Sequence, residues 1–155
     1  MTAQGPEQRL SELGLAVPEV AAPLAAYVPA VSTGSLVFTA GQLPLRSGEL
    51  IATGTVGQGV TPDEATMCAQ QCVLNAIAAL KAEIGDLTRV RRVVKVVVFV
   101  ASAPDFTGQP QVANGASELL AQVFGDAGRH ARSAVGVAVL PLGAPVEVEL
   151  VVEVG

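Results

Sequence analysis

The chain has 155 residues, of which 50% are hydrophobic, 15% are charged and 3% are aromatic; this length suits one domain with an aliphatic core and excludes two. The net charge of −5 at pH 7 repels phosphate backbones, and the scarcity of aromatic side chains leaves few surfaces for base stacking, so both properties argue against nucleic-acid binding. A surface with so few charges suggests instead that part of it is buried against other subunits.

The N-terminal part predicts a short helix and no targeting segment. Residues Glu7–Leu13 fit an amphipathic helix, and Val17–Ala26 is rich in Pro and Ala. The first residues lack the basic region and apolar core of a signal peptide, and the apolar stretch Val93–Ala101 is too short to span a bilayer. We therefore expect a cytoplasmic protein without membrane contact, in which residues 1–155 form one domain and residues 1–24 an N-terminal extension.

Short strands are predicted next. The segments Tyr27–Ala30, Leu36–Thr39 and Glu49–Thr53 have the composition of strands, and Ser32–Ser35 has the composition of a turn between the first two. The segment Ala40–Pro44 contains Gly and Pro and interrupts the strand pattern.

A long helix follows. Thr61 and Glu64 form a capping-box pattern, and Pro62 occupies the first helical position. Small and apolar residues then recur at helical spacing until Gly85, which is typical of a helix C-terminus.

Two cysteines, Cys68 and Cys72, lie four residues apart on this helix. They are interpreted as small apolar residues of a buried helix face, in preference to a metal or redox pair. His130 is the only histidine, so a zinc site would lack ligands, and we expect no metal.

The second half of the chain alternates strands and a helix. The sequence predicts a central strand at Arg92–Val100, a loop at Pro104-Asp105, a helix at Pro110–Phe124, and strands at Ala131–Leu140 and Val146–Val154. This order predicts an α+β fold, with one mixed β-sheet and both long helices packed on one of its faces.

Two charged residues stand out on the last two strands. Because side chains alternate between the faces of a strand, the more apolar face of each strand is expected beneath the helices, so that Arg132 and Glu147 point away from them. Ala and Gly on the same face as Arg132 leave room for a ligand or for a neighbouring subunit. A guanidinium is a planar fork that matches a carboxylate, so Arg132 either binds a ligand or forms an ion pair with Glu147 across neighbouring strands.

Three segments together resemble the Rid family, the reactive-intermediate deaminases of YjgF type, also labelled L-PSP endoribonucleases and translation inhibitors. The segments are Tyr27–Pro44, Val97–Val100 with Asp105-Phe106 and Asn114, and Ala131–Ser133 through Leu140-Pro141 to Val146–Glu149. The resemblance covers nearly all of the chain from Tyr27 onward, and the additional N-terminal residues are similar to a longer subgroup.

The resemblance implies a chorismate-mutase-like subunit, a homotrimer with clefts between its subunits, and hydrolysis of 2-imino acids to 2-keto acids and ammonia without a cofactor. It further implies a role for each matching residue. Arg132 would hold the substrate carboxylate and Glu147 would position or activate water. Gly41 would approach the imine through its backbone, Tyr27 would line the site, and Asn114 would support it.

Each of the last three residues also has a structural interpretation. Tyr27 can be a partly buried ring with a solvated hydroxyl group, and Asn114 can break or cap a helical turn. Gly41 can mark a position that tolerates no side chain or that needs a positive φ.

The chain departs from the family pattern at two positions. Ala134 stands where the deaminases often have Cys, and Gly136 stands where an acidic residue is usual. If position 134 contributes only its backbone N–H to substrate binding, Ala can replace Cys there; Gly136 suggests a different substrate range.

Three other functions remain open. One is a non-catalytic regulatory trimer that binds a small carboxylate, and another is the endoribonuclease or translation inhibitor of the older family label. A chorismate mutase is more distant, because its dianionic substrate needs more cationic side chains. The deaminase chemistry itself needs no metal, because a protonated imine is already an electrophile; a partly shielded Glu147 with a raised pKa would suit a general base.

Overall fold

The computed structural model describes residues 3–155, which contain a five-stranded sheet with the order β1-β2-β9-β7-β8. The strands of this sheet are β1 (Ala30–Thr33), β2 (Leu36–Thr39), β7 (Val90–Ala101), β8 (Ala131–Val137) and β9 (Val146–Val154). β7 and β8 run parallel, whereas the other neighbouring strands are antiparallel. The predicted mixed sheet is therefore confirmed.

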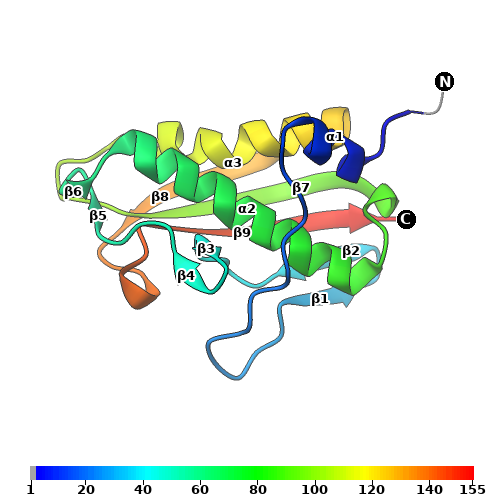
Figure 1. Cartoon of the computed structure of the whole chain (residues 1–155), viewed down its shortest axis with the longest axis horizontal. Coiled ribbons are helices and arrows are strands. Elements are labelled where there is room, and N and C mark those ends of the chain that lie inside the picture. The colour runs from blue at the N-terminus through cyan, green and yellow to red at the C-terminus, as the bar shows by residue number, and fades with distance from the viewer. Residues whose placement is uncertain (1–2) are drawn as a thin grey trace.

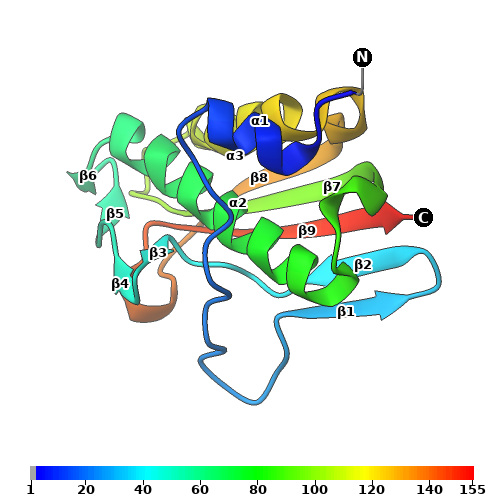
Figure 2. The same ribbon diagram turned by 45° about the vertical axis from the view of Figure 1, so that its right-hand side comes forward.

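Helices α2 (Pro62–Ile84) and α3 (Gln109–Phe124) pack against each other on one face of this sheet (Figures 1 and 2), as predicted. The capping box at the start of α2 is present in full: the Thr61 side chain accepts from the Glu64 backbone N–H, and the Glu64 carboxylate accepts from the Thr61 backbone N–H. The short helix α1 (Pro6–Glu12) lies over α3, and an ion pair between Glu7 and Lys81 ties it to α2.

The core lies between the sheet and the two long helices. β9 alternates strictly between buried and partly buried residues, and its buried side chains Val146, Val148, Leu150 and Val152 are at most 1% exposed. Cys68 and Cys72 are free thiols in this core, with 1% and 0% of their surface exposed. Their interpretation as small apolar residues of a buried helix face is confirmed.

None of the three α-helices of residues 3–155 lies on the opposite face of the sheet. We call this the open face. The residues on this face that pair across neighbouring strands include Val31 with Phe38, Phe38 with Val151, Val97 with Glu149 and Ser133, and Phe99 with Glu147 and Val135. The open face mixes apolar residues with charged ones such as Glu147, Glu149 and Lys95, and its Val31, Phe38 and Val135 are 52%, 44% and 43% exposed.

The small strands and several strand ends differ from the sequence predictions. β1 begins at Ala30, so the strand predicted at Tyr27–Ala30 is wrong for its first three residues. The strand predicted at Glu49–Thr53 is reduced to β4, and β8 ends at Val137, three residues early. The structure also contains two ladders of two residue pairs each, which were not predicted. They join β3 (Leu45–Arg46) to β4 (Glu49–Leu50), and β5 (Thr55–Val56) to β6 (Gly59–Val60).

Within residues 3–155, no helix has the length and apolar character needed to cross a membrane. The same residues contain no cluster of three or more His, Cys, Asp or Glu side chains suited to hold a metal ion.

Candidate functional site

Arg132 is anchored on helix α3. Its Nη1 donates to Asn114 Oδ1 at 2.8 Å and to Ser117 Oγ at 3.2 Å. Among residues 3–155, Nε and Nη2 of Arg132 have no hydrogen-bond acceptor. One edge of the guanidinium fork is therefore available for a bidentate partner, such as a carboxylate.

The predicted orientation of Arg132 is wrong, because its side chain points toward the helices. In the parallel ladder Arg132 pairs with Val96, and Val96 is fully buried beneath the helical layer. Residues paired across a ladder share one face of the sheet, so Arg132 lies on the helix side.

The error has a physical cause in β8. This strand is at the edge of the sheet, and the helical layer covers it incompletely. Its more apolar side, which includes Val135, belongs to the open face and not to the core. The rule that the apolar face of a strand lies beneath the helices therefore fails for β8, because most of its apolar residues lie on the open face instead.

Asn114 lies inside α3, and its amide oxygen accepts from Arg132. The alternative that it caps or breaks a helix is not supported, because α3 begins at Gln109 and continues beyond Asn114. Sequence reasoning missed Ser117, one helical turn further along, which is the second anchor of Arg132. The i, i+3 spacing of two small polar residues on one helix face was the available signal.

Glu147 lies on β9 and points toward the open face, as predicted. Its neighbours Val146 and Val148 are fully buried on the helix side, and its ladder partner Phe99 lies on the open face. Burial raises the pKa of the Glu147 carboxyl group above its ordinary value, and the negative charge of Glu149 raises it further.

Gly41 packs directly against Glu147. A Cβ atom at position 41 would lie 2.9 Å from Cδ of Glu147, and closer still to Oε1. The backbone around Gly41 is fixed by two hydrogen bonds between the main chains of Gln42 and Val148, at 2.8 and 3.0 Å. The interpretation of Gly41 as a position without room for a side chain is confirmed, and its φ is not positive.

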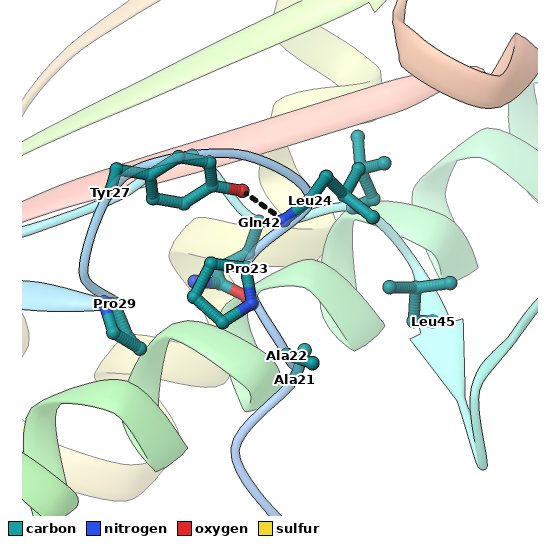
Figure 3. A pocket seen from close by; sticks show the side chains of 10 residues that line it. Ala21, Ala22, Pro23, Leu24, Tyr27, Pro29, Gln42 and Leu45 are labelled. Atoms are coloured by element: carbon teal, nitrogen blue, oxygen red, sulfur yellow. Dashed lines mark hydrogen bonds between the residues drawn. The ribbon is translucent and has the colours of Figure 1, made fainter.

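Tyr27 and Glu147 line one groove of about 550 Å³ beside Gly41. Most of the other lining side chains are apolar; they include Leu24, Val28, Val31, Phe38 and Pro141. The Tyr27 ring is 44% exposed, and its hydroxyl oxygen accepts from the backbone N–H of Leu24 at 3.1 Å. Figure 3 shows this bond, which braces the bend of chain before β1. Sequence reasoning did not identify Leu24 or Val28 as parts of the groove.

The two positions that depart from the family pattern lie on the same side of β8 as Arg132. Ala134 pairs with the buried Val98 and packs partly against the core. A Cβ atom at Gly136 would lie 2.9 Å from Nε2 of Gln109. A side chain at position 136 would therefore have to displace the end of the Gln109 side chain.

The predicted residues form two separate groups on one chain. Arg132, Asn114 and Ala134 lie on the helix side of the sheet edge, whereas Tyr27, Gly41 and Glu147 surround the groove on the other side. Strand β7 separates β8 from β9, and the register places Arg132 beside Val96 and Glu147 beside Phe99. With strand spacings of 4.7–4.9 Å and a rise of ~3.3 Å per residue, the two Cα atoms are about 14 Å apart.

An ion pair between Arg132 and Glu147 within one chain is therefore wrong. Their strands are not neighbours, and the salt bridge found in residues 3–155 joins Lys81 to Glu7. Each group is also chemically incomplete: one has a cation without an acid, and the other has an acid without a cation.

Comparison with known proteins agrees with the fold. Residues 7–154 match the family model described as "YjgF/chorismate mutase-like, putative endoribonuclease". Protein TCP17 of Trypanosoma cruzi is 48% identical over 145 residues, covering 93% of this chain and 91% of that protein. The 2-iminobutanoate/2-iminopropanoate deaminase of Dermatophagoides farinae is 31% identical over 138 residues, covering 89% of this chain and 93% of that protein.

A solved structure has nearly the same fold. The crystal structure of a "putative endoribonuclease" from Shewanella oneidensis MR-1 superposes with a TM-score of 0.95 and 36% sequence identity, covering 97% of this chain and 100% of that one. The predicted resemblance is thus confirmed, and this chain belongs to the YjgF/chorismate mutase-like family, which includes the Rid proteins.

Proposed function

We propose that this protein hydrolyses reactive 2-imino acids to 2-keto acids and ammonia, in clefts between the subunits of a homotrimer. The observation that carries the proposal is the division of the site into two incomplete halves on one chain. Arg132 presents a free guanidinium edge on one side, and Glu147 presents a partly buried carboxylate with a raised pKa on the other. A neighbouring subunit that brings its Arg132 to this Glu147 completes the site.

The open face supports association. It exposes the apolar side chains of Val31, Phe38 and Val135, and exposed apolar surface is typical of subunit contacts. The groove beside Glu147 begins on this face, since Val31 and Phe38 also line it. Packing the open faces of several chains together would therefore place a partner's residues next to the groove.

The chemistry then divides between the two halves. Nε and Nη2 of Arg132 bind the substrate carboxylate and fix the imine carbon in position. Glu147 accepts a proton from water while the water oxygen bonds to that carbon. The proton passes from Glu147 to the nitrogen and gives a carbinolamine whose amine is protonated. Glu147 then accepts the remaining hydroxyl proton while the C–N bond breaks, ammonia leaves with the bonding electron pair and a carbonyl forms. A positioned carboxylate base contributes about 10²–10⁴-fold to the rate of such a step.

Gly41 allows this arrangement, because the missing Cβ gives the Glu147 carboxylate its place beside the backbone. Ala134 favours the alternative of carboxylate binding without turnover, because it has no thiol where the deaminases often have one. The two functions share Arg132 and differ only in whether product appears.

The proposal is tested with 2-iminobutanoate generated in situ by an amino-acid oxidase. The assay compares the unmodified protein with Arg132→Lys and Glu147→Gln, and the mass of each in solution is measured alongside. Lys retains the charge but loses the fork, so we expect kcat/KM to fall about 100-fold in Arg132→Lys. A trimeric protein that binds 2-oxobutanoate but does not accelerate ammonia release would establish the binding function instead. RNA cleavage that disappears in Arg132→Lys would support the older family label and contradict the proposal.

A further inference from the structure

The single histidine of the chain lies next to the Arg132 anchor. Nδ1 of His130 is 2.6 Å from the carbonyl oxygen of Gly128, and Nε2 is 2.8 Å from Oγ of Ser117. A carbonyl oxygen only accepts, so Nδ1 carries the hydrogen. In the neutral ring Nε2 is then an acceptor, and the Ser117 hydroxyl donates to it.

This bond determines what Ser117 offers to Arg132. A serine hydroxyl has one proton and two lone pairs. With the proton committed to His130, Ser117 can only accept from Nη1 of Arg132, at 3.2 Å. A continuous chain of hydrogen bonds therefore runs from the Gly128 carbonyl through His130 and Ser117 to the guanidinium.

We propose that Ser117 and His130 are positioning residues for Arg132: they hold Nη1 toward α3, so that the Nε and Nη2 edge faces the substrate carboxylate. This inference rests on the proposed function of Arg132 as the carboxylate anchor. Neither residue touches substrate. They act by fixing the plane of the guanidinium before the ligand arrives, which reduces the ordering cost of binding.

The start of this chain of hydrogen bonds is rigid. A Cβ atom at Gly128 would lie 2.7 Å from the carbonyl carbon of Leu120, so the Gly128 backbone packs tightly on α3. Ser117 is held by the same helix, and His130 directly precedes β8. Asn114 adds a second contact, because its Oδ1 accepts from the same Nη1. Two acceptors on one nitrogen define both the position and the plane of the fork.

The first experiment does not depend on enzymatic activity. Because the chain has one histidine, the ¹⁵N spectrum of protein carrying no histidine tag shows one pair of imidazole signals. At pH 8 we expect the shifts of the tautomer with hydrogen on Nδ1, and we expect Ser117→Ala to change the Nε2 shift. A ring with its hydrogen on Nε2 would overturn the proposal, because Ser117 would then be free to donate elsewhere.

The second experiment separates positioning from chemistry. In Ser117→Ala and in His130→Leu we expect KM to rise about tenfold with kcat nearly unchanged, near the lower end of the effect of one hydrogen bond to a charged group. His130→Gln is expected to restore most of the loss, because its Oε1 can accept from Ser117. The double variant is expected to match either single variant, since the two residues act as one unit. Gln122→Ala, an exposed change on the same helix, controls for effects of mutation on α3 itself.

Failure of this inference is distinguishable from failure of the proposed function. If Arg132→Lys impairs hydrolysis but Ser117→Ala and His130→Leu leave KM unchanged, positioning is refuted and the deaminase proposal stands. If the unmodified protein has no hydrolase activity, the same variants are tested for the Kd of 2-oxobutanoate. A tenfold weaker Kd then supports positioning, and an unchanged Kd refutes it.

Discussion

The clearest test of the divided site is complementation between two inactive variants. Arg132→Ala and Glu147→Gln each remove one half. Within one chain the Cα atoms of Arg132 and Glu147 are about 14 Å apart on opposite sides of the sheet. The carboxylate and the imine carbon of a 2-imino acid are joined by a single bond, so both side chains must reach adjacent atoms. We therefore expect them to act on one substrate only when they come from different chains.

The fraction of activity that we expect to return follows from random assembly of the two variant chains. When equal amounts of the two variants are dissociated and reassembled, a cleft is intact only if each of its two chains supplies the native residue. Each condition holds for half of the chains, so about one quarter of the clefts recover, whatever the number of subunits in the ring. Hydrolysis of 2-iminobutanoate should then return to about one quarter of the native rate per chain.

A matched control distinguishes sites between chains from sites within one chain by the activity that remains. When the native chain is reassembled with an equal amount of the Arg132→Ala/Glu147→Gln double variant, sites between chains again leave about one quarter of native activity, whereas sites within a chain would leave about half. Mixing the two single variants without dissociating them should give no recovery. An inactive reassembled mixture with the native mass in solution would refute the divided site.

Four further predictions concern individual side chains. Because burial raises the pKa of Glu147, kcat/KM should fall as pH drops through a value above the ordinary carboxyl range, and Glu147→Gln should remove this limb of the profile. Because the pKa of Glu147 is raised in the folded protein, its ionised carboxylate destabilises the fold once the pH exceeds this pKa. Glu147→Gln should therefore increase the free energy of unfolding more at pH 8 than at pH 4, as measured by urea unfolding. Gly41→Ala should displace the Glu147 carboxylate and lower kcat about 100-fold with retained mass and fold, which kinetics and circular dichroism check. Burial raises the pKa of Cys68 to about 11 and that of Cys72 well above its ordinary value, so neither thiol should react with a disulfide reagent at pH 8 until the protein unfolds; fast labelling of the native protein would contradict this.

The parts of the fold that local chemistry determines were predictable from the sequence. The capping box at Thr61 located the start of α2 to the residue, and the alternation along Val146–Val154 gave both the bounds of β9 and the direction of Glu147. In both cases the signal lies within a few residues, because capping and pleating are short-range effects.

The orientation of Arg132 could not be obtained in this way. It depends on which side of an edge strand faces the helices, and in β8 the more apolar side, with Val135, belongs to the open face. Only the pairing of Arg132 with the buried Val96 decides it, and that pairing is a long-range contact. The strands β3, β5 and β6 were missed for a different reason: a two-residue ladder has no periodicity to detect.

The residues of the candidate site remain a prediction from the resemblance, and their arrangement could not be predicted from the sequence. The resemblance to a known family identified Arg132, Glu147, Tyr27, Gly41 and Asn114 by position. It did not show that a single chain keeps the arginine apart from the glutamate. Ser117 and His130 carry no motif of their own, and only their contacts connect them to Arg132.

The place of β9 in the sheet has a consequence for synthesis on the ribosome. β9 lies between β2 and β7, and both partners precede it in the chain; its Leu150 N–H donates to Thr39 Oγ1, 111 residues earlier. Until β9 emerges, the nascent hairpin of β1 and β2 and the long β7 each present an unpaired strand edge. Such edges recruit other chains, and pairing across so long a loop is slow. We therefore expect the growing polypeptide to depend on chaperone protection until its central strand is made.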